Sequence, residues 1–133
     1  MAVLGWLLGP EPVHVSDVVY KDASRRWQSD PRPGLAPGTP AAALIGPGTY
    51  SSGEALAYHF QAQRLGPLVG ERTPGAADHV TPIVLDAHVR ANLPRGYVRD
   101  AVTGANWEQT GVRPDVPCAE AEALERALDL LRG

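Results

Sequence analysis

The chain has 133 residues, with 12 lysines and arginines against 15 aspartates and glutamates, giving a formal net charge of −3. This length corresponds to one domain, and the mixed charge argues against the basic surface that nucleic-acid binding requires. Because no basic cluster exceeds the pair Arg25 and Arg26, nucleic acid is not an expected partner. The single cysteine, Cys118, permits no internal disulfide and forms no zinc motif, so no metal and no other cofactor is predicted.

The apolar start, residues 3–8, reads as a helix end. It lacks a basic flank and is interrupted by Gly9 and Pro10, so it predicts neither a signal peptide nor a membrane span. As written, the chain is expected in the cytoplasm and not inserted in a membrane. Residues 12–20 follow, in which valines mix with polar residues in a pattern typical of a strand.

Residues 21–40 form a proline- and glycine-rich stretch. Proline cannot donate a backbone hydrogen bond, so regular structure is expected to stop here and an exposed excursion to begin. Excursions of this length are often functional. This one could cover a site or be a passive loop, with Trp27 as its one large anchor.

A strand, a helix and a second strand are predicted next. Residues 41–45 read as a short buried strand, Gly46 to Gly48 break it, and residues 51–65 favour helix. Residues 66–71 read as a strand parallel to the first, so the three elements form a right-handed crossover.

The last part of the chain is predicted to hold two strands and a helix. Residues 80–85 and 87–93 read as an antiparallel pair or a bent strand, with Arg90, Arg95 and Arg99 as exposed cations nearby. The helix 119–131 carries four apolar residues at heptad-like spacing, which we expect to face the core: Ala121, Leu124, Leu128 and Leu131.

Ser51 stands where the predicted strand 41–45 leads into the helix. There the first backbone N–H groups of the helix have no internal partner and can stabilise an oxyanion. Ser51 is therefore a candidate nucleophile. The alternative is a capping box with Glu54, three residues later. The G-x-S-x-G elbow does not apply, because Thr49 stands where that motif needs glycine.

Four segments in order carry a family resemblance: Ser51-Ser-Gly-Glu-Ala-Leu-Ala-Tyr58, Leu65-Gly-Pro-Leu-Val-Gly-Glu-Arg-Thr-Pro-Gly75, Thr103-Gly-Ala-Asn-Trp-Glu-Gln-Thr-Gly-Val-Arg-Pro-Asp-Val116, and the helix 119–131. Together they resemble the tail-specific protease family of serine peptidases, closer to its tricorn-like and retinoid-binding-protein-like branch. The resemblance covers most of 41–131 and, more weakly, 7–20. It implies an α/β fold with a crotonase- or ClpP-like layered ββα core. It also implies proteolysis of peptides or unfolded proteins through an acyl-enzyme, in a family that is often exported.

The resemblance assigns roles to three residues. Ser51 occupies the nucleophile position, and the amide of Ser52 would be one oxyanion donor. Glu108 matches a glutamate of the active-site network. For Glu108 the alternative is a solvated carboxylate on a loop.

A general base is harder to assign, because a serine hydroxyl must lose its proton as it attacks. The position of the family's lysine is Ala76, and the only lysine is Lys21. His79 is the one histidine in a loop expected near Ser51, and Asp78 beside it could orient the ring. The other three histidines are expected to be ordinary surface or half-buried residues: His14, His59 and His88.

The resemblance also implies that parts of a catalytic domain are missing from residues 1–50. We therefore expect 1–133 to be a single, partial peptidase domain that lacks its N-terminal half. An uncovered sheet edge then predicts self-association, as a homo-oligomer, or low solubility. Two functions stay open: a serine peptidase domain, and an inactive fragment or a domain of the same fold that binds a peptide or an apolar ligand.

Overall fold

The computed structural model describes residues 2–36 and 38–133. Pro37, within the predicted excursion, lies outside the described residues. The elements in chain order are α1 (Ala2–Leu8), β1 (His14–Tyr20), β2 (Ser24–Gln28), β3 (Ala43–Ile45), α2 (Ser52–Ala62), β4 (Leu68–Gly70), β5 (His79–Val84), β6 (Arg90–Asp100), β7 (Val116–Pro117), the 3₁₀ turn η1 (Glu120–Glu122) and α3 (Ala123–Arg132). None of the described helices is long and apolar enough to cross a membrane.

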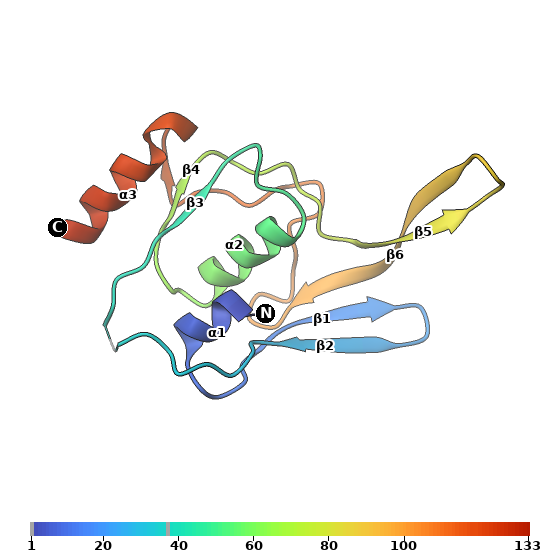
Figure 1. Cartoon of the computed structure of the whole chain (residues 1–133), viewed down its shortest axis with the longest axis horizontal. Helices are drawn as coiled ribbons and strands as arrows, with labels where there is room; N and C mark the ends of the chain where they lie inside the picture. The colour runs from blue at the N-terminus through green and yellow to red at the C-terminus, as the bar shows by residue number, and fades with distance from the viewer. Residues whose placement is uncertain (1, 37) are drawn as a thin grey trace.

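Helix α2 lies in the middle of the molecule, between two sheets (Figure 1). One sheet has the strand order β2-β1-β6-β5 and the other the order β3-β4-β7. Both sheets and the helix contribute to one hydrophobic core, which includes Val18 of β1, Phe60 of α2 and Leu68 of β4. The chain thus has the layered α/β architecture that was predicted.

The predicted crossover is confirmed. Strands β3 and β4 are parallel, with Ala43 opposite Leu68 and Ile45 opposite Gly70, and α2 connects them. The strands and the helix are a few residues shorter than predicted, because the flanking residues serve as turns. This unit fixes the first turn of α2 at the end of β3, where the candidate nucleophile stands.

Helix α3 covers the other face of the three-stranded sheet, but not through its leucines. Its buried residues are Ala123 and Ala127, which pack on Val69, whereas Leu124 and Leu128 are 60% and 40% exposed. The prediction of a core-facing leucine stripe is therefore wrong. Small side chains face the sheet because the helix lies close to it: a Cβ added to Gly70 would lie 3.6 Å from that of Ala123.

The excursion 21–40 is less irregular than predicted. Residues 24–28 form β2, an edge strand that pairs antiparallel with β1. This segment precedes the first proline of the stretch, Pro31, so its backbone keeps every N–H group. The rest of the excursion, from residue 29 onward, contains no further strand or helix among its described residues.

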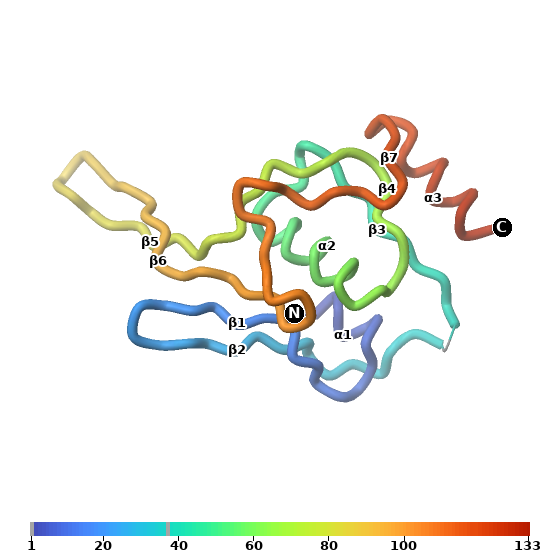
Figure 2. Tube along the Cα trace, turned by 180° about the vertical axis from the view of Figure 1, so that it is seen from behind, coloured from blue at the N-terminus to red at the C-terminus, as the bar shows by residue number. Residues whose placement is uncertain are grey.

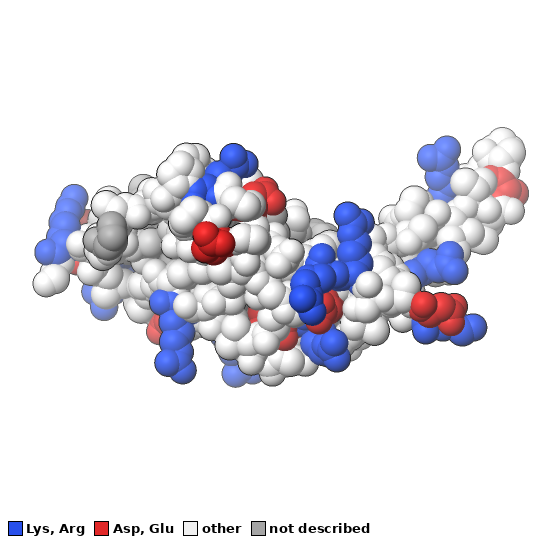
Figure 3. Space-filling model, turned by 90° about the horizontal axis from the view of Figure 1, so that it is seen from below, with Lys and Arg blue, Asp and Glu red and all other residues white. Residues whose placement is uncertain are grey.

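Strands β5 and β6 form an arm that projects from the body (Figures 1 and 2). The predicted antiparallel pairing is confirmed, but β6 runs on to Asp100, beyond the predicted end, and pairs there with β1. Pro94 is tolerated within this strand because β1 pairs only with residues 96–100, so at Pro94 just one side is paired. On the face seen in Figure 3, basic and acidic side chains are interspersed.

Candidate active site

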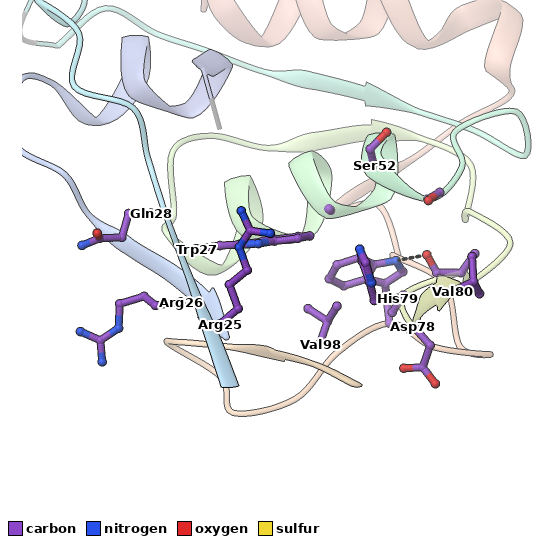
Figure 4. A pocket seen from close by; sticks show the side chains of 14 residues that line it. Arg25, Arg26, Trp27, Gln28, Ser52, Asp78, His79, Val80 and Val98 are labelled. Carbon is purple, nitrogen blue, oxygen red and sulfur yellow. Dashed lines mark hydrogen bonds between the residues drawn. The ribbon is translucent and has the colours of Figure 1, made fainter. Parts of the chain in front are cut away.

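A pocket of about 600 Å³ lies at the N-terminal end of α2. Its walls come mainly from three places: the first turn of α2, strand β2, and residues 76–80 at the start of β5. Val98 of β6 and Trp107 complete them. Figure 4 shows Ser52 on α2, Trp27 on β2 and His79 on β5 arranged around it. Ser51 lines the same pocket. Segments far apart in the sequence therefore meet where the helix begins.

Ser51 adopts a strained backbone conformation. Its φ is 52° and its ψ is −108°, a combination that residues with a side chain rarely adopt. Such strain costs about 1–3 kcal/mol and clusters at functional sites. The G-x-S-x-G motif was excluded by Thr49, yet the chain makes the same kind of strained strand-to-helix turn around a serine. This turn holds Ser51 at the pocket.

The capping box predicted for Ser51 and Glu54 is present, but its two contacts differ in geometry. The Glu54 carboxylate accepts a hydrogen bond from the Ser51 amide at 2.9 Å. The Ser51 side chain faces the backbone N–H of Glu54, but this contact does not have the geometry of a side-chain cap hydrogen bond. Glu54 thus fixes the backbone of Ser51, while the hydroxyl is not committed to capping.

Glu54 is completely buried and ties the start of α2 to the segment 73–76. Besides the Ser51 amide it accepts hydrogen bonds from the Thr73 hydroxyl and from the amides of Gly75 at 2.7 Å and Ala76 at 2.9 Å. Gly75 has φ 102°, and a Cβ there would lie 2.7 Å from the amide nitrogen of Gly111. Only glycine fits this position, which explains the glycine of the Glu-Arg-Thr-Pro-Gly75 run.

Glu108 is not a solvated loop carboxylate. It accepts hydrogen bonds from the amides of Ala77 at 2.7 Å and Asp78 at 2.8 Å, so it holds the pocket wall from behind. Burial and the nearby charge of Glu108 raise the pKa of Asp78. In Figure 4 the Asp78 carboxylate points away from α2.

His79 is held by aromatic side chains. Its ring makes edge contacts with Tyr20 and Trp27, at centroid distances of 5.9 and 6.3 Å. Its Nδ1 lies 3.2 Å from the Tyr20 hydroxyl. Asp78, which could have oriented the ring, makes no such bond, and its Oδ1 is buried without a partner among the described residues. The partner of His79 is therefore Tyr20, 59 residues away in sequence.

Ser52 and Ala76 complete the surroundings of Ser51. Ser52 is the first residue of α2, where no carbonyl within the helix can accept its N–H. Ala76, at the position where the resemblance expects a lysine, lines the pocket together with Ser51. The pocket therefore has room for a base from that position but no lysine to supply it.

His59 was expected to be a surface or half-buried histidine, and this is wrong. It is completely buried, and its Nδ1 lies 2.8 Å from Oδ2 of Asp100. The ring packs edge-on against Trp107. His59 does not line the pocket, and eight helical residues place it about 12 Å along the axis from Ser51.

Other residues in the pocket, and Tyr20 beside it, were missed by sequence reasoning. Tyr20 and Arg25 carry no motif, and Trp27 was noted only as an anchor of the excursion. The alternation of β2 is the one signal that could have placed Arg25 and Trp27 on the same face. No group of three or more His, Cys, Asp or Glu within residues 2–36 and 38–133 could hold a metal ion.

Comparison with known proteins agrees with the fold. The model of peptidase family S41 matches residues 3–118. Among solved structures, the chain is similar to a photosystem II D1 C-terminal processing protease, with a TM-score of 0.69, 21% identity, and coverage of 96% of this chain and 33% of the other. It is also similar to a lipoprotein from Streptococcus agalactiae (TM-score 0.69, 20% identity, coverage 97% and 47%). A putative peptidase from Parabacteroides merdae has a TM-score of 0.77 at 16% identity, with coverage of 98% and 46%. The chain thus spans less than half the length of each of these proteins.

Proposed function

The chain belongs to peptidase family S41, and we propose that it is the part of a serine peptidase that carries the nucleophile, Ser51. The observation that carries the proposal is the strained turn, with φ 52° and ψ −108°, which holds Ser51 at the pocket. A cap needs no such strain, because ordinary N-cap residues have extended backbone angles.

The proposed reaction is the hydrolysis of a peptide bond through an acyl-enzyme. Ser51 Oγ attacks the carbonyl carbon, and its proton passes to Nε2 of His79. The oxyanion accepts a hydrogen bond from the amide of Ser52. The C–N bond then breaks as His79 returns the proton to the leaving amine, and a water activated by His79 hydrolyses the acyl-Ser51 ester.

The contact between His79 and Tyr20 decides which ring nitrogen can act. If Nδ1–H donates to the Tyr20 hydroxyl, 3.2 Å away, Nε2 is free to accept a proton. The mechanism uses this tautomer. Tyr20 is then a positioning residue, because it acts through His79.

Glu108 and Glu54 position the site in this proposal. Glu108 holds the amides of Ala77 and Asp78, directly before His79, and Glu54 holds the amides of Ser51 and Ala76. Neither carboxylate needs to touch the substrate. This gives Glu108 a supporting role, as the family resemblance implies.

A second function is favoured by one observation. The pocket contains Ala76 where a lysine base is expected, and much of its surface is apolar, including Trp27, Val98 and Trp107. A chain without a working base would bind a peptide or an apolar ligand and not cleave it. The two functions differ in whether Ser51 is activated.

Labelling with a fluorophosphonate probe separates them, because the probe reacts only with an activated serine. We expect intact mass spectrometry to find one adduct on the wild-type chain and none on Ser51→Ala. The matched control Ser52→Ala keeps its backbone amide and should still be labelled. His79→Ala should be labelled at least tenfold more slowly, since a general base contributes about 10²–10⁴-fold.

Two results would contradict the proposal. Equal labelling of Ser51→Ala would place the reactive group elsewhere. No labelling of a wild-type chain that circular dichroism shows to be folded would favour the binding function.

A further inference from the structure

One wall of the pocket is the inner face of strand β2. Successive residues of a strand point to opposite faces. All four residues of 25–28 line the pocket, but in Figure 4 the side chains of Arg25 and Trp27 project toward α2, whereas those of Arg26 and Gln28 project away from it. A cation and an indole therefore stand side by side, across the pocket from the first turn of α2.

Arg25 is a cation without a counter-charge. Within the described part of the chain its guanidinium makes no ion pair and no hydrogen bond, whereas the Arg26 guanidinium lies 3.9 Å from Asp17. The only carboxyl among the residues that line the pocket belongs to Asp78, and it points away from α2 in Figure 4. The pocket is therefore electropositive on the β2 side.

The position of Trp27 shows how far Arg25 lies from the reacting groups. The Trp27 ring contacts His79. Arg25 precedes Trp27 by two residues in β2, so the two residues are about 6.6 Å apart along the strand. A peptide that runs extended beside β2 advances about 3.3 Å per residue. A group that meets Arg25 is then about two residues from a bond that lies beside His79.

We propose that Arg25, beside Trp27, forms a subsite for a carboxylate of the bound peptide, about two residues from the bond that Ser51 attacks. The inference rests on the proposed function, because it places the substrate along the same pocket. Arginine presents a fork of N–H donors that matches a carboxylate. The carboxylate is either the C-terminus of the peptide or the side chain of an aspartate or glutamate.

Binding of short peptides to the full chain carrying Ser51→Ala tests the subsite without any need for catalysis. Isothermal titration calorimetry would compare acetyl-Ala-Leu-Ala-Ala with a free carboxylate and with a carboxamide end. It would also compare acetyl-Ala-Leu-Ala-Asp-amide with its Asn counterpart. We expect at least one charged peptide to bind about tenfold more tightly than its neutral partner, as for a hydrogen bond to a charged group. The pair that shows the preference identifies the source of the carboxylate.

The matched variants are Arg25→Gln and Arg26→Gln, which remove the same charge from neighbouring residues of β2. We expect Arg25→Gln to abolish the preference and Arg26→Gln to keep it. The proposal is overturned if charged and neutral peptides bind equally, if the preference survives in Arg25→Gln, or if none of the four peptides binds at millimolar concentration. Failure of the proposed function looks different: peptides would still bind, but the wild-type chain would not be labelled at Ser51.

Discussion

A buried carboxylate lies at each end of α2, and the surroundings of the two carboxylates differ. At the N-terminal end, Glu54 accepts hydrogen bonds from Ser51, Thr73, Gly75 and Ala76. Toward the C-terminal end, Asp100 accepts them from His59, from the amide of Val102, and from the amide and hydroxyl of Thr103. Each carboxylate thus ties the helix region to a segment distant in sequence.

The two ends differ in their access to solvent: the N-terminal end of α2 is open, and the end at His59 is sealed. The segments that Glu54 joins line an open pocket, whereas the pair of His59 and Asp100 is sealed beneath Trp107. A histidine bonded to an aspartate resembles part of a catalytic triad, yet neither His59 nor Asp100 lines the pocket where Ser51 stands. Meanwhile the histidine beside the pocket, His79, has a tyrosine as its partner. Proximity to the pocket, and not the identity of the pair, therefore decides which histidine is a candidate base.

The largest expected effect on stability comes from removing the Glu54 carboxylate at the open end of α2. Glu54→Ala leaves four donors without their acceptor, and since each unsatisfied buried group costs about 1–3 kcal/mol, we expect a loss of about 3–5 kcal/mol in the free energy of unfolding. Urea denaturation would measure it, with the exposed Glu125→Ala on α3 as control. A loss below about 1 kcal/mol would show that water replaces Glu54 easily and that it does not hold the pocket together.

At the sealed end of α2, Asp100 is expected to make a smaller and pH-dependent contribution to the free energy of unfolding. Burial opposes ionisation of Asp100, but the hydrogen bonds from His59 and Thr103 outweigh it, and the pKa falls below the ordinary value of 3.8. Because the folded state holds the lower pKa, this contribution is fully present above pH 3.8 and is lost as the pH falls through the lowered pKa.

Asp100→Asn should therefore cost about 1–3 kcal/mol near neutral pH, and the gap to the wild type should narrow in acid. Urea titrations between pH 7 and pH 3 would measure both chains, with Asp129→Asn on the surface of α3 as control. A gap that stays constant down to pH 3 would contradict the lowered pKa.

The open end was partly predictable from sequence, because its signals are local. The break at Gly46 to Gly48 and the three-residue spacing of Ser51 and Glu54 lie within nine residues. By contrast, the partners of Glu54 at residues 73–76 and the pairing of His59 with Asp100, 41 residues away, are set by how the two sheets enclose α2. No local pattern encodes those contacts.

Two errors show how composition misled. The prolines of 21–40 lie from Pro31 onward, so averaging over the stretch hid the proline-free strand β2 and its pocket-facing Arg25 and Trp27. In α3 the leucines suggested the buried face, but the face that lies against the sheet is about 100° away, one residue around the helix. There the close approach to Gly70 favours alanine. Hydrophobicity predicts that a face is buried only where the neighbouring surface leaves room for it.

The smallest expected effect is the most informative about the open end. If Ser51 mainly capped α2, Ser51→Ala would cost about 0.5–2 kcal/mol, as N-cap replacements do. Its hydroxyl makes no cap hydrogen bond of good geometry, so we expect a change within about 0.5 kcal/mol, the range of substitutions that break no interaction. Ser51→Gly should be at least as stable as Ser51→Ala, since glycine adopts a φ of 52° without steric cost. Urea denaturation of the three chains measures this order. A costly alanine together with a still costlier glycine would mean that the serine side chain stabilises the helix start, and that the strained turn has a structural cause.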